Sequence, residues 1–110
     1  MRSKVIKEAI ERASSLPYRA TATLIGSYAR GDFNLWSDVD IVLIADFKGN
    51  PLERLKLIDA PYGFQIIPLM KEEFLRLLER RNPIAVEVVQ NGIILRDDFG
   101  INKLIKSAIK

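Results

Sequence analysis

The chain has 110 residues, which suits one compact domain spanning 1–110 and is too short for two. Its net charge of +3 comes from acidic and basic residues interspersed along the chain, a pattern that argues against a nucleic-acid partner. Cysteine and histidine are absent, which excludes disulfides, thiolate and histidine metal sites, and nucleophilic catalysis of the Ser-His-Asp and Cys-His classes.

Carboxylates, lysines, tyrosines and hydroxyls remain as the chemically useful side chains. An enzyme of this composition is therefore expected to work through a metal bound by oxygen atoms. The sequence contains neither a signal-peptide pattern nor an apolar run of membrane-spanning length, and we expect a cytoplasmic protein without membrane contact.

Helical and strand patterns alternate along the chain. Apolar residues recur at helical spacing from Ser3 to Leu16, and a near-continuous aliphatic run from Val39 to Ala45 is typical of a strand covered on both faces. The predicted set comprises a helix at 3–16, strands at 19–25 and 39–45, a helix at 51–58, a strand at 62–69, helices at 71–80 and 83–90, a strand at 93–96 and a final helix. This order predicts an α/β (α+β) fold, a small mixed sheet of three to four strands flanked by helices.

Local signals predict where some elements sit and end. Pro68 restricts its strand to a sheet edge or to the strand's end. Asn82 is expected to cap the helix that begins at Pro83, and Asp97 and Asp98 are expected to open the final helix. The residues predicted to face inward from that helix are Leu104, Ile105, Ala108 and Ile109.

A Gly-Ser pair follows the first predicted strand. Gly26 would let the backbone approach a phosphate closely, and the free amides and the Ser27 hydroxyl could donate hydrogen bonds to its oxygens. A plain turn is the alternative interpretation of these two residues.

Two aspartates stand at the head of the aliphatic run. Residues two apart on a strand point to the same face, so Asp38 and Asp40 would place two carboxylates side by side. Such a pair repels itself unless a cation lies between, and ligands bind at the ends of parallel strands. The pattern favours metal ligation over the alternative, a polar turn with Asp40 facing solvent.

The segments Gly26–Asp32 (GSYARGD) and Ser37–Val42 (SDVDIV) together resemble the signature of the polymerase-β-like nucleotidyltransferases. The short chain is similar to their minimal nucleotidyltransferase group, which prokaryotes often pair with a HEPN-domain toxin. The motif match covers residues 24–44, and the predicted order of elements is compatible with that fold over the whole chain.

The resemblance implies transfer of a nucleoside monophosphate, usually AMP from ATP, to an acceptor hydroxyl with release of pyrophosphate. It implies that Gly26 and Ser27 hold the triphosphate and that Asp38 and Asp40 ligate two magnesium ions (Mg2+). Two hard cations bridged by carboxylates stabilise the attacking and leaving oxygens in line. Arg30 is either a neutralising partner of the outer phosphates or a solvated or ion-paired arginine.

The chain departs from the family pattern at a third acidic residue, which active members carry on a neighbouring strand. The corresponding position is Gln65, and Asp59 and Glu72 are the nearest acidic residues outside that strand. Glutamine offers a metal one neutral carbonyl oxygen and no charge. Two hypotheses therefore stand: a working nucleotidyltransferase that modifies a protein or small molecule, and a catalytically impaired nucleotide- or metal-binding module that neutralises a partner such as a HEPN toxin.

An apolar loop is predicted beside the site. If Phe33, Leu35 and Trp36 are exposed, they suit a protein interface or a platform for a nucleotide base. The alternative is that Trp36 folds back over the core. Self-association is also open for a single small domain.

Overall fold

A computed structural model describes residues 1–56 and 58–108, apart from the side chains of Pro51 and Ala108. The elements in chain order are α1 (Arg2–Ser14), β1 (Ala20–Ile25), α2 (Gly26–Arg30), β2 (Val39–Ala45), α3 (Pro51–Lys56), β3 (Phe64–Leu69), α4 (Lys71–Glu79), α5 (Pro83–Asn91), β4 (Ile93–Asp97) and α6 (Ile101–Ala108). Within the described ranges every helix is too short or too polar to span a bilayer.

The four strands form one mixed sheet in the order β3-β2-β1-β4, which confirms the predicted fold class. β1 pairs antiparallel with both β2 and β4, whereas β2 and β3 run parallel. β3 is an edge strand, as Pro68 predicted, because proline cannot donate to a second neighbouring strand. The end of β1 and the starts of β2 and β3 therefore meet at one end of the sheet.

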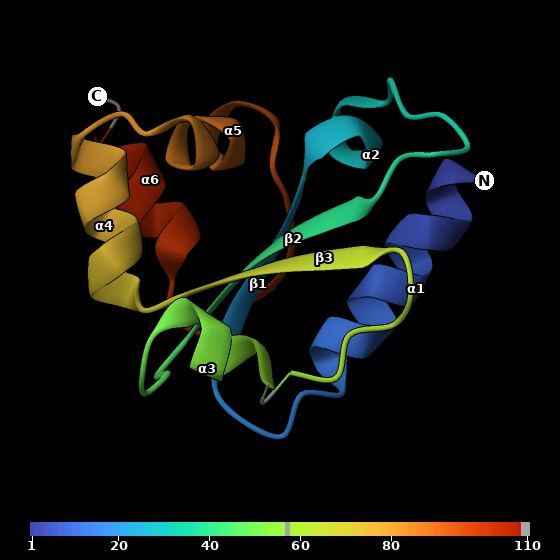
Figure 1. Cartoon of the computed structure of the whole chain (residues 1–110). Helices are drawn as coiled ribbons and strands as arrows, with labels where there is room; N and C mark the ends of the chain where they lie inside the picture. Colours follow the sequence, from blue (N-terminus) through green and yellow to red (C-terminus); the bar gives the residue numbers. More distant parts are fainter. Residues whose placement is uncertain (57, 109–110) are drawn as a thin grey trace.

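Helices cover both faces of the sheet (Figure 1). α1 packs on one face, where Ile41 and Leu43 of β2 join its Ala9 in one apolar cluster. α4, α5 and α6 cover the other face, where Val42 and Ile44 point. β2 thus supplies apolar side chains to two cores, and the prediction of a strand buried on both faces is confirmed.

Most predicted elements occur with shifted ends. α1 stops at Ser14, and at this end of the helix the Arg96 guanidinium donates to the backbone carbonyls of Ala13 and Leu16 at 2.9 and 3.0 Å. β3 begins at Phe64, since the two residues before it form a turn whose glycine has a φ of 87°.

The final helix begins at Ile101, not directly after Asp98 as predicted. Asp97 closes β4, and its carboxylate accepts the Ile101 amide at 2.8 Å, so it still caps the helix from four residues away. Asp98 instead accepts the Ala20 amide at 3.0 Å and pairs with Arg96 at 2.7 Å. It therefore fastens β4 to the start of β1.

The apolar face of α6 was predicted in part. Ile105 is buried and Leu104 is half-buried, as expected, and Ile101 is buried as well. The predicted inward positions of Ile109 and of the Ala108 side chain lie outside the described residues.

No sequence pattern indicated that Arg54 of α3 would be buried. Its guanidinium donates to the carbonyls of Gly49 and Pro68 at 2.9 and 3.3 Å and to the Glu73 carboxylate at 2.5 Å. Glu73 also accepts the Met70 amide at 2.7 Å, at the start of α4. This ion pair joins α3, β3 and α4.

Candidate functional site

The predicted Gly-Ser turn lies against the predicted acidic pair. The β1–β2 register pairs Ile25 with Asp40, so the chain passes the Asp40 carboxylate as it turns into α2. Gly26 has a φ of 78°, and a Cβ added there would lie 2.4 Å from Oδ2 of Asp40. Only glycine allows both the backbone conformation and this close approach.

Helix α2 begins at the turn itself. The first amides of a helix have no partner inside it, so the amide of Ser27 and those that follow can bind an anion or water. Ser27 is half-buried, with its hydroxyl in the same turn. The turn therefore presents amides and a hydroxyl as hydrogen-bond donors, and phosphate binding by them stays a prediction.

The two aspartates differ in their surroundings. Asp40 is half-buried in β2, whereas Asp38 is exposed and precedes the strand instead of lying in it. Burial raises the pKa of the Asp40 carboxyl, the negative charge of Asp38 raises it further, and the positive charge of Arg30 partly opposes the rise. The three side chains therefore share one electrostatic environment.

Gln65 is the direct neighbour of Asp40 in the sheet. The two residues are register partners in the parallel β2–β3 ladder, and partners in a ladder point to the same face. The amide side chain thus lies beside Asp40, at the position that the family resemblance assigns to a third carboxylate. Gln65 is exposed, so its carbonyl oxygen is available to a ligand.

A third acidic group does not join this pair. In the described part of the chain, no three Asp, Glu, His or Cys side chains gather as a metal site. Asp59 lines a cavity under α1, on the face of the sheet opposite to Asp40. Glu72 stands in the first turn of α4, beyond the other end of β3.

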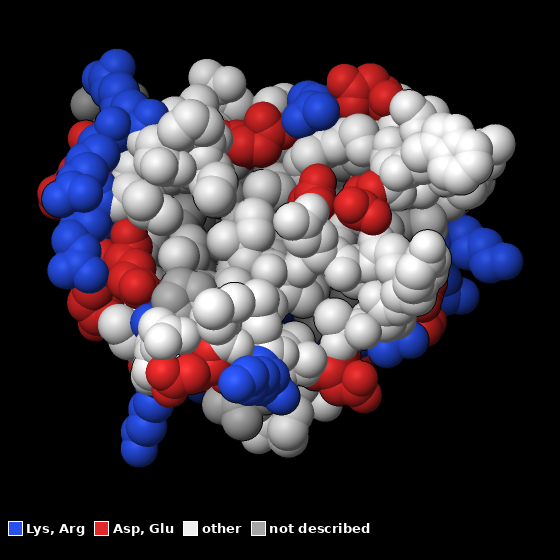
Figure 2. Space-filling view, in the orientation of Figure 1, with Lys and Arg blue, Asp and Glu red and all other residues white. Residues whose placement is uncertain are grey.

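Arg30, at the end of α2, is ion-paired. Its Nη1 donates to the Glu87 carboxylate of α5 at 2.8 Å, and its Nε donates to Asp32 at 3.2 Å. The hydrogen bonds to Glu87 and Asp32 hold the pKa of Arg30 above its ordinary value. Figure 2 shows a basic group over α2 between acidic groups, above the acidic side chains at the start of β2. Glu87 was not singled out from the sequence.

Arg2 is a second residue that sequence reasoning missed. Its Nε and Nη2 donate to the carbonyls of Tyr28 and Ala29, each at 2.8 Å. These carbonyls belong to the last turn of α2, so the N-terminus of the chain holds the helix that follows the Gly-Ser turn. The partners are more than 25 residues apart, and no local pattern could have indicated the contact.

The loop between α2 and β2 is partly anchored. Phe33 is half-buried and stacks on Tyr28, with ring centroids 4.5 Å apart. Leu35 and Trp36 are 82% and 91% exposed, so the alternative in which Trp36 covers the core is wrong. The Trp36 amide donates to Oδ1 of Asn34 at 2.8 Å, which shapes the turn that presents the indole to solvent.

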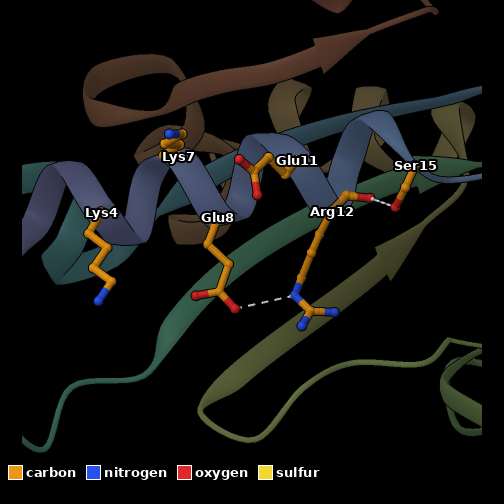
Figure 3. A pocket seen from close by; sticks show the side chains of 6 residues that line it. All are labelled: Lys4, Lys7, Glu8, Glu11, Arg12 and Ser15. Atoms are coloured by element: carbon orange, nitrogen blue, oxygen red, sulfur yellow. Dashed lines mark hydrogen bonds and ion pairs between the residues drawn. The ribbon is translucent and has the colours of Figure 1, made fainter.

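Two hollows follow α1, away from the aspartates. One is open, about 560 Å³, and is lined by residues of α1 and by Ser15 directly after it (Figure 3). Its lining residues are Lys4, Lys7, Glu8, Glu11, Arg12 and Ser15. The other, about 340 Å³, is mostly apolar and lies between α1 and the β2–β3 face opposite to Asp40. Neither adds a residue to the candidate site, which lies on the other face of the sheet.

The oxygen donors of the site suit a hard divalent cation. Asp38 and Asp40 supply carboxylate oxygens and Gln65 supplies a neutral carbonyl oxygen, the ligand types that Mg2+ prefers. A cation between the carboxylates would relieve the repulsion that raises the pKa of Asp40. A second cation would have fewer charged ligands than the first, because Gln65 is neutral.

A family model described as nucleotidyltransferase domain matches residues 4–108. A solved toxin–antitoxin structure with AMP-PNP is 19% identical over 98% of this chain and 83% of that chain, with a TM-score of 0.53. A mutant of the toxin–antitoxin MntA–HpeT is 17% identical over 99% of this chain and 84% of that chain, with a TM-score of 0.53. A Sulfolobus solfataricus protein described as a nucleotidyltransferase is 23% identical over 84% of this chain and 75% of that chain, with a TM-score of 0.45. No curated protein matches the chain.

Proposed function

The chain belongs to the nucleotidyltransferase domain family, and we propose that it transfers AMP from ATP to a hydroxyl of a protein partner or small molecule. In this proposal it is the antitoxin of a HEPN/MNT toxin–antitoxin pair and acts in the cytoplasm. The observation that carries the proposal is the contact of the Gly26 turn with Asp40, beside Asp38 at one end of the sheet. A phosphate-binding turn and a pair of metal-binding carboxylates would thus meet.

Each site residue has a distinct task in the proposal. Gly26 and Ser27 bind the triphosphate through backbone amides and the hydroxyl, and Arg30 lies at the end of the same short helix. Asp38 and Asp40 hold Mg2+, which when bound neutralises the phosphates and stabilises the attacking and leaving oxygens. The acceptor oxygen forms a bond to the α-phosphorus, the bond from the α-phosphorus to the bridging oxygen breaks, pyrophosphate leaves, and the hydroxyl proton passes to solvent.

Two solved neighbours support the partner and the nucleotide. Both are toxin–antitoxin complexes that match nearly the whole of this chain, and one contains the ATP analogue AMP-PNP. The exposed Leu35 and Trp36 lie in the loop that leads to Asp38, where a partner protein could contact them. This position supports an acceptor carried by a protein surface.

A second candidate function is a binding module without turnover. Gln65 and the absence of a third acidic ligand among the described residues favour it, because the cation that activates the acceptor would be weakly held. Such a module would bind nucleotide or metal and neutralise a toxin by covering it.

Incubation with ATP labelled on the α-phosphate and Mg2+, with and without a HEPN-domain protein, tests the proposal. Transfer should occur with the wild type and fail with Asp38→Ala/Asp40→Ala. Asp46→Ala is the matched control, since Asp46 is an exposed aspartate just past the other end of β2. Equal labelling by the wild type and the Asp38→Ala/Asp40→Ala variant would refute the assigned site.

A carboxylate introduced at position 65 distinguishes between the two candidate functions. Gln65→Asp places a charge beside Asp40 in the parallel register. If the wild type binds nucleotide without transferring it and Gln65→Asp gains transfer, the binding-module function is supported. If the wild type transfers label efficiently, that function is excluded.

A further inference from the structure

The guanidinium of Arg30 is already occupied by carboxylates of the protein itself. Nη1 donates to Glu87 at 2.8 Å and Nε to Asp32 at 3.2 Å, whereas Nη2 makes no hydrogen bond to any described residue. A phosphate binds arginine best through two parallel hydrogen bonds. Such a contact would need at least one nitrogen that a carboxylate now holds.

Of the two carboxylates, Glu87 is held in the more protected position. Its side chain is 25% exposed, against 63% for Asp32, and exposed ion pairs are weakened by water and salt. Glu87 also lies within α5, a nine-residue helix that packs on β1 and α2, so its carboxylate is fixed relative to the turn.

The ion pair is close to the proposed phosphate site. Helix α2 rises about 6 Å between Gly26 and Arg30 at the usual 1.5 Å per residue. The charge of Arg30 also acts on the Asp40 carboxyl, which touches Gly26. A triphosphate bound at Gly26 and Ser27 would therefore lie within reach of the Arg30 charge and of the Glu87 charge that offsets it.

We propose that Glu87 competes with the phosphates of the nucleotide for Arg30 and thereby weakens nucleotide binding. This inference rests on the proposed nucleotide site. The carboxylate acts as an internal substitute for a phosphate, and it sets the affinity for the anion without contacting the reacting atoms. A residue that only oriented Arg30 would have the opposite effect, because its loss would weaken binding.

The test is the affinity for AMP-PNP in the presence of Mg2+, measured by isothermal titration calorimetry. Glu87→Gln should tighten binding by about three- to tenfold, the range expected when one nearby, partly screened charge is removed. Arg30→Gln should weaken binding. In the Arg30→Gln background, Glu87→Gln should tighten binding less than it does when Arg30 is present, because no guanidinium is left to release.

A charge-matched control is available on α1. Glu8 also pairs with an arginine, Arg12 at 3.4 Å, on the exposed surface of that helix (Figure 3). Glu8→Gln removes the same charge from the protein but should leave AMP-PNP affinity unchanged. Melting temperatures of all variants confirm that each is folded during the titration.

The outcomes separate this inference from the proposed function. If the wild type binds AMP-PNP and Glu87→Gln binds no more tightly than Glu8→Gln, the inference is wrong and the nucleotide site stands. If the wild type binds weakly and Glu87→Gln binds well, the inference is supported. If neither binds, both the inference and the proposed function are wrong.

Discussion

Replacement of Gly26 by alanine should both strain the backbone and displace the Asp40 carboxylate. With a φ of 78°, an L-residue at this position costs about 1–2 kcal/mol. The added methyl would also lie 2.4 Å from Oδ2 of Asp40, too close for any real contact. We therefore expect Gly26→Ala to lose stability and to move a proposed metal ligand.

Gly100→Ala isolates the backbone cost. Gly100 has a similar φ of 68°, but a Cβ there would meet no atom within 4 Å. Its unfolding free energy should fall by about 1 kcal/mol, which lowers the melting temperature by about 4–8 °C in a domain near this size. The unfolding free energy of Gly26→Ala should fall further than that of Gly100→Ala. Only Gly26→Ala should lose affinity for Mg2+ and AMP-PNP.

A double-mutant cycle isolates the methyl–carboxylate contact. In an Asp40→Ala background the methyl at position 26 meets no carboxylate, so Gly26→Ala should cost only as much as Gly100→Ala. Urea unfolding of the single and double variants gives the coupling energy. If the losses of unfolding free energy from Gly26→Ala and Asp40→Ala simply add, or if Gly26→Ala binds AMP-PNP normally, the argument that Gly26 must lie close to the Asp40 carboxylate is refuted.

Four other changes should have measurable effects. Arg54→Ala should cost about 3–5 kcal/mol in urea unfolding because it leaves Glu73 without its buried partner, and a loss below about 1 kcal/mol would show that the pair is not structural. Burial raises the pKa of Glu73, but hydrogen bonds from Arg54 and the Met70 amide outweigh it and leave that pKa below its ordinary value. The stability that Glu73 adds is thus present above its unfolded pKa of 4.5 and lost as the pH falls through the folded pKa, and an unchanged acid dependence of unfolding in Glu73→Gln would contradict this. Gly92→Ala should destabilise the fold, since its Cβ would lie 2.4 Å from a backbone oxygen of α5; a melting temperature equal to the wild type would be the contrary result. Asp40→Asn should raise the melting temperature without metal at neutral pH, because the raised pKa of Asp40 marks an unfavourable charge, and a lower melting temperature would count against that reasoning.

The parts of the fold predicted from sequence are those that local patterns determine. The aliphatic run of β2 was found with its true bounds, because six of its seven residues are buried apolar side chains and leave a near-continuous apolar signal. The edge position of β3 followed from Pro68, and the start of α5 from Asn82, whose side chain accepts the amide of Ile84 at 3.0 Å. Each signal lies within a few residues of the feature that it predicts.

Contacts between distant parts of the chain could not be predicted in this way. Glu87 meets Arg30 across 57 residues, and Arg96 reaches the carbonyls of Ala13 and Leu16 across 83 and 80 residues. On the sequence each is an ordinary charged residue, typical of a solvated helix face or a strand end. Their roles depend on which elements the sheet brings together, so the partners of an arginine become visible only in three dimensions.

The candidate site contains the features that stability alone would not favour. Gly26 adopts a φ that other residues avoid, and Asp40 places a carboxylate at the buried end of a strand beside the charge of Asp38. A chain selected only to fold would gain stability from an amide or apolar residue at position 40. The two unfavourable features lie against each other, so a ligand that carries phosphates and brings a cation would offset both. This coincidence supports the proposed nucleotide site.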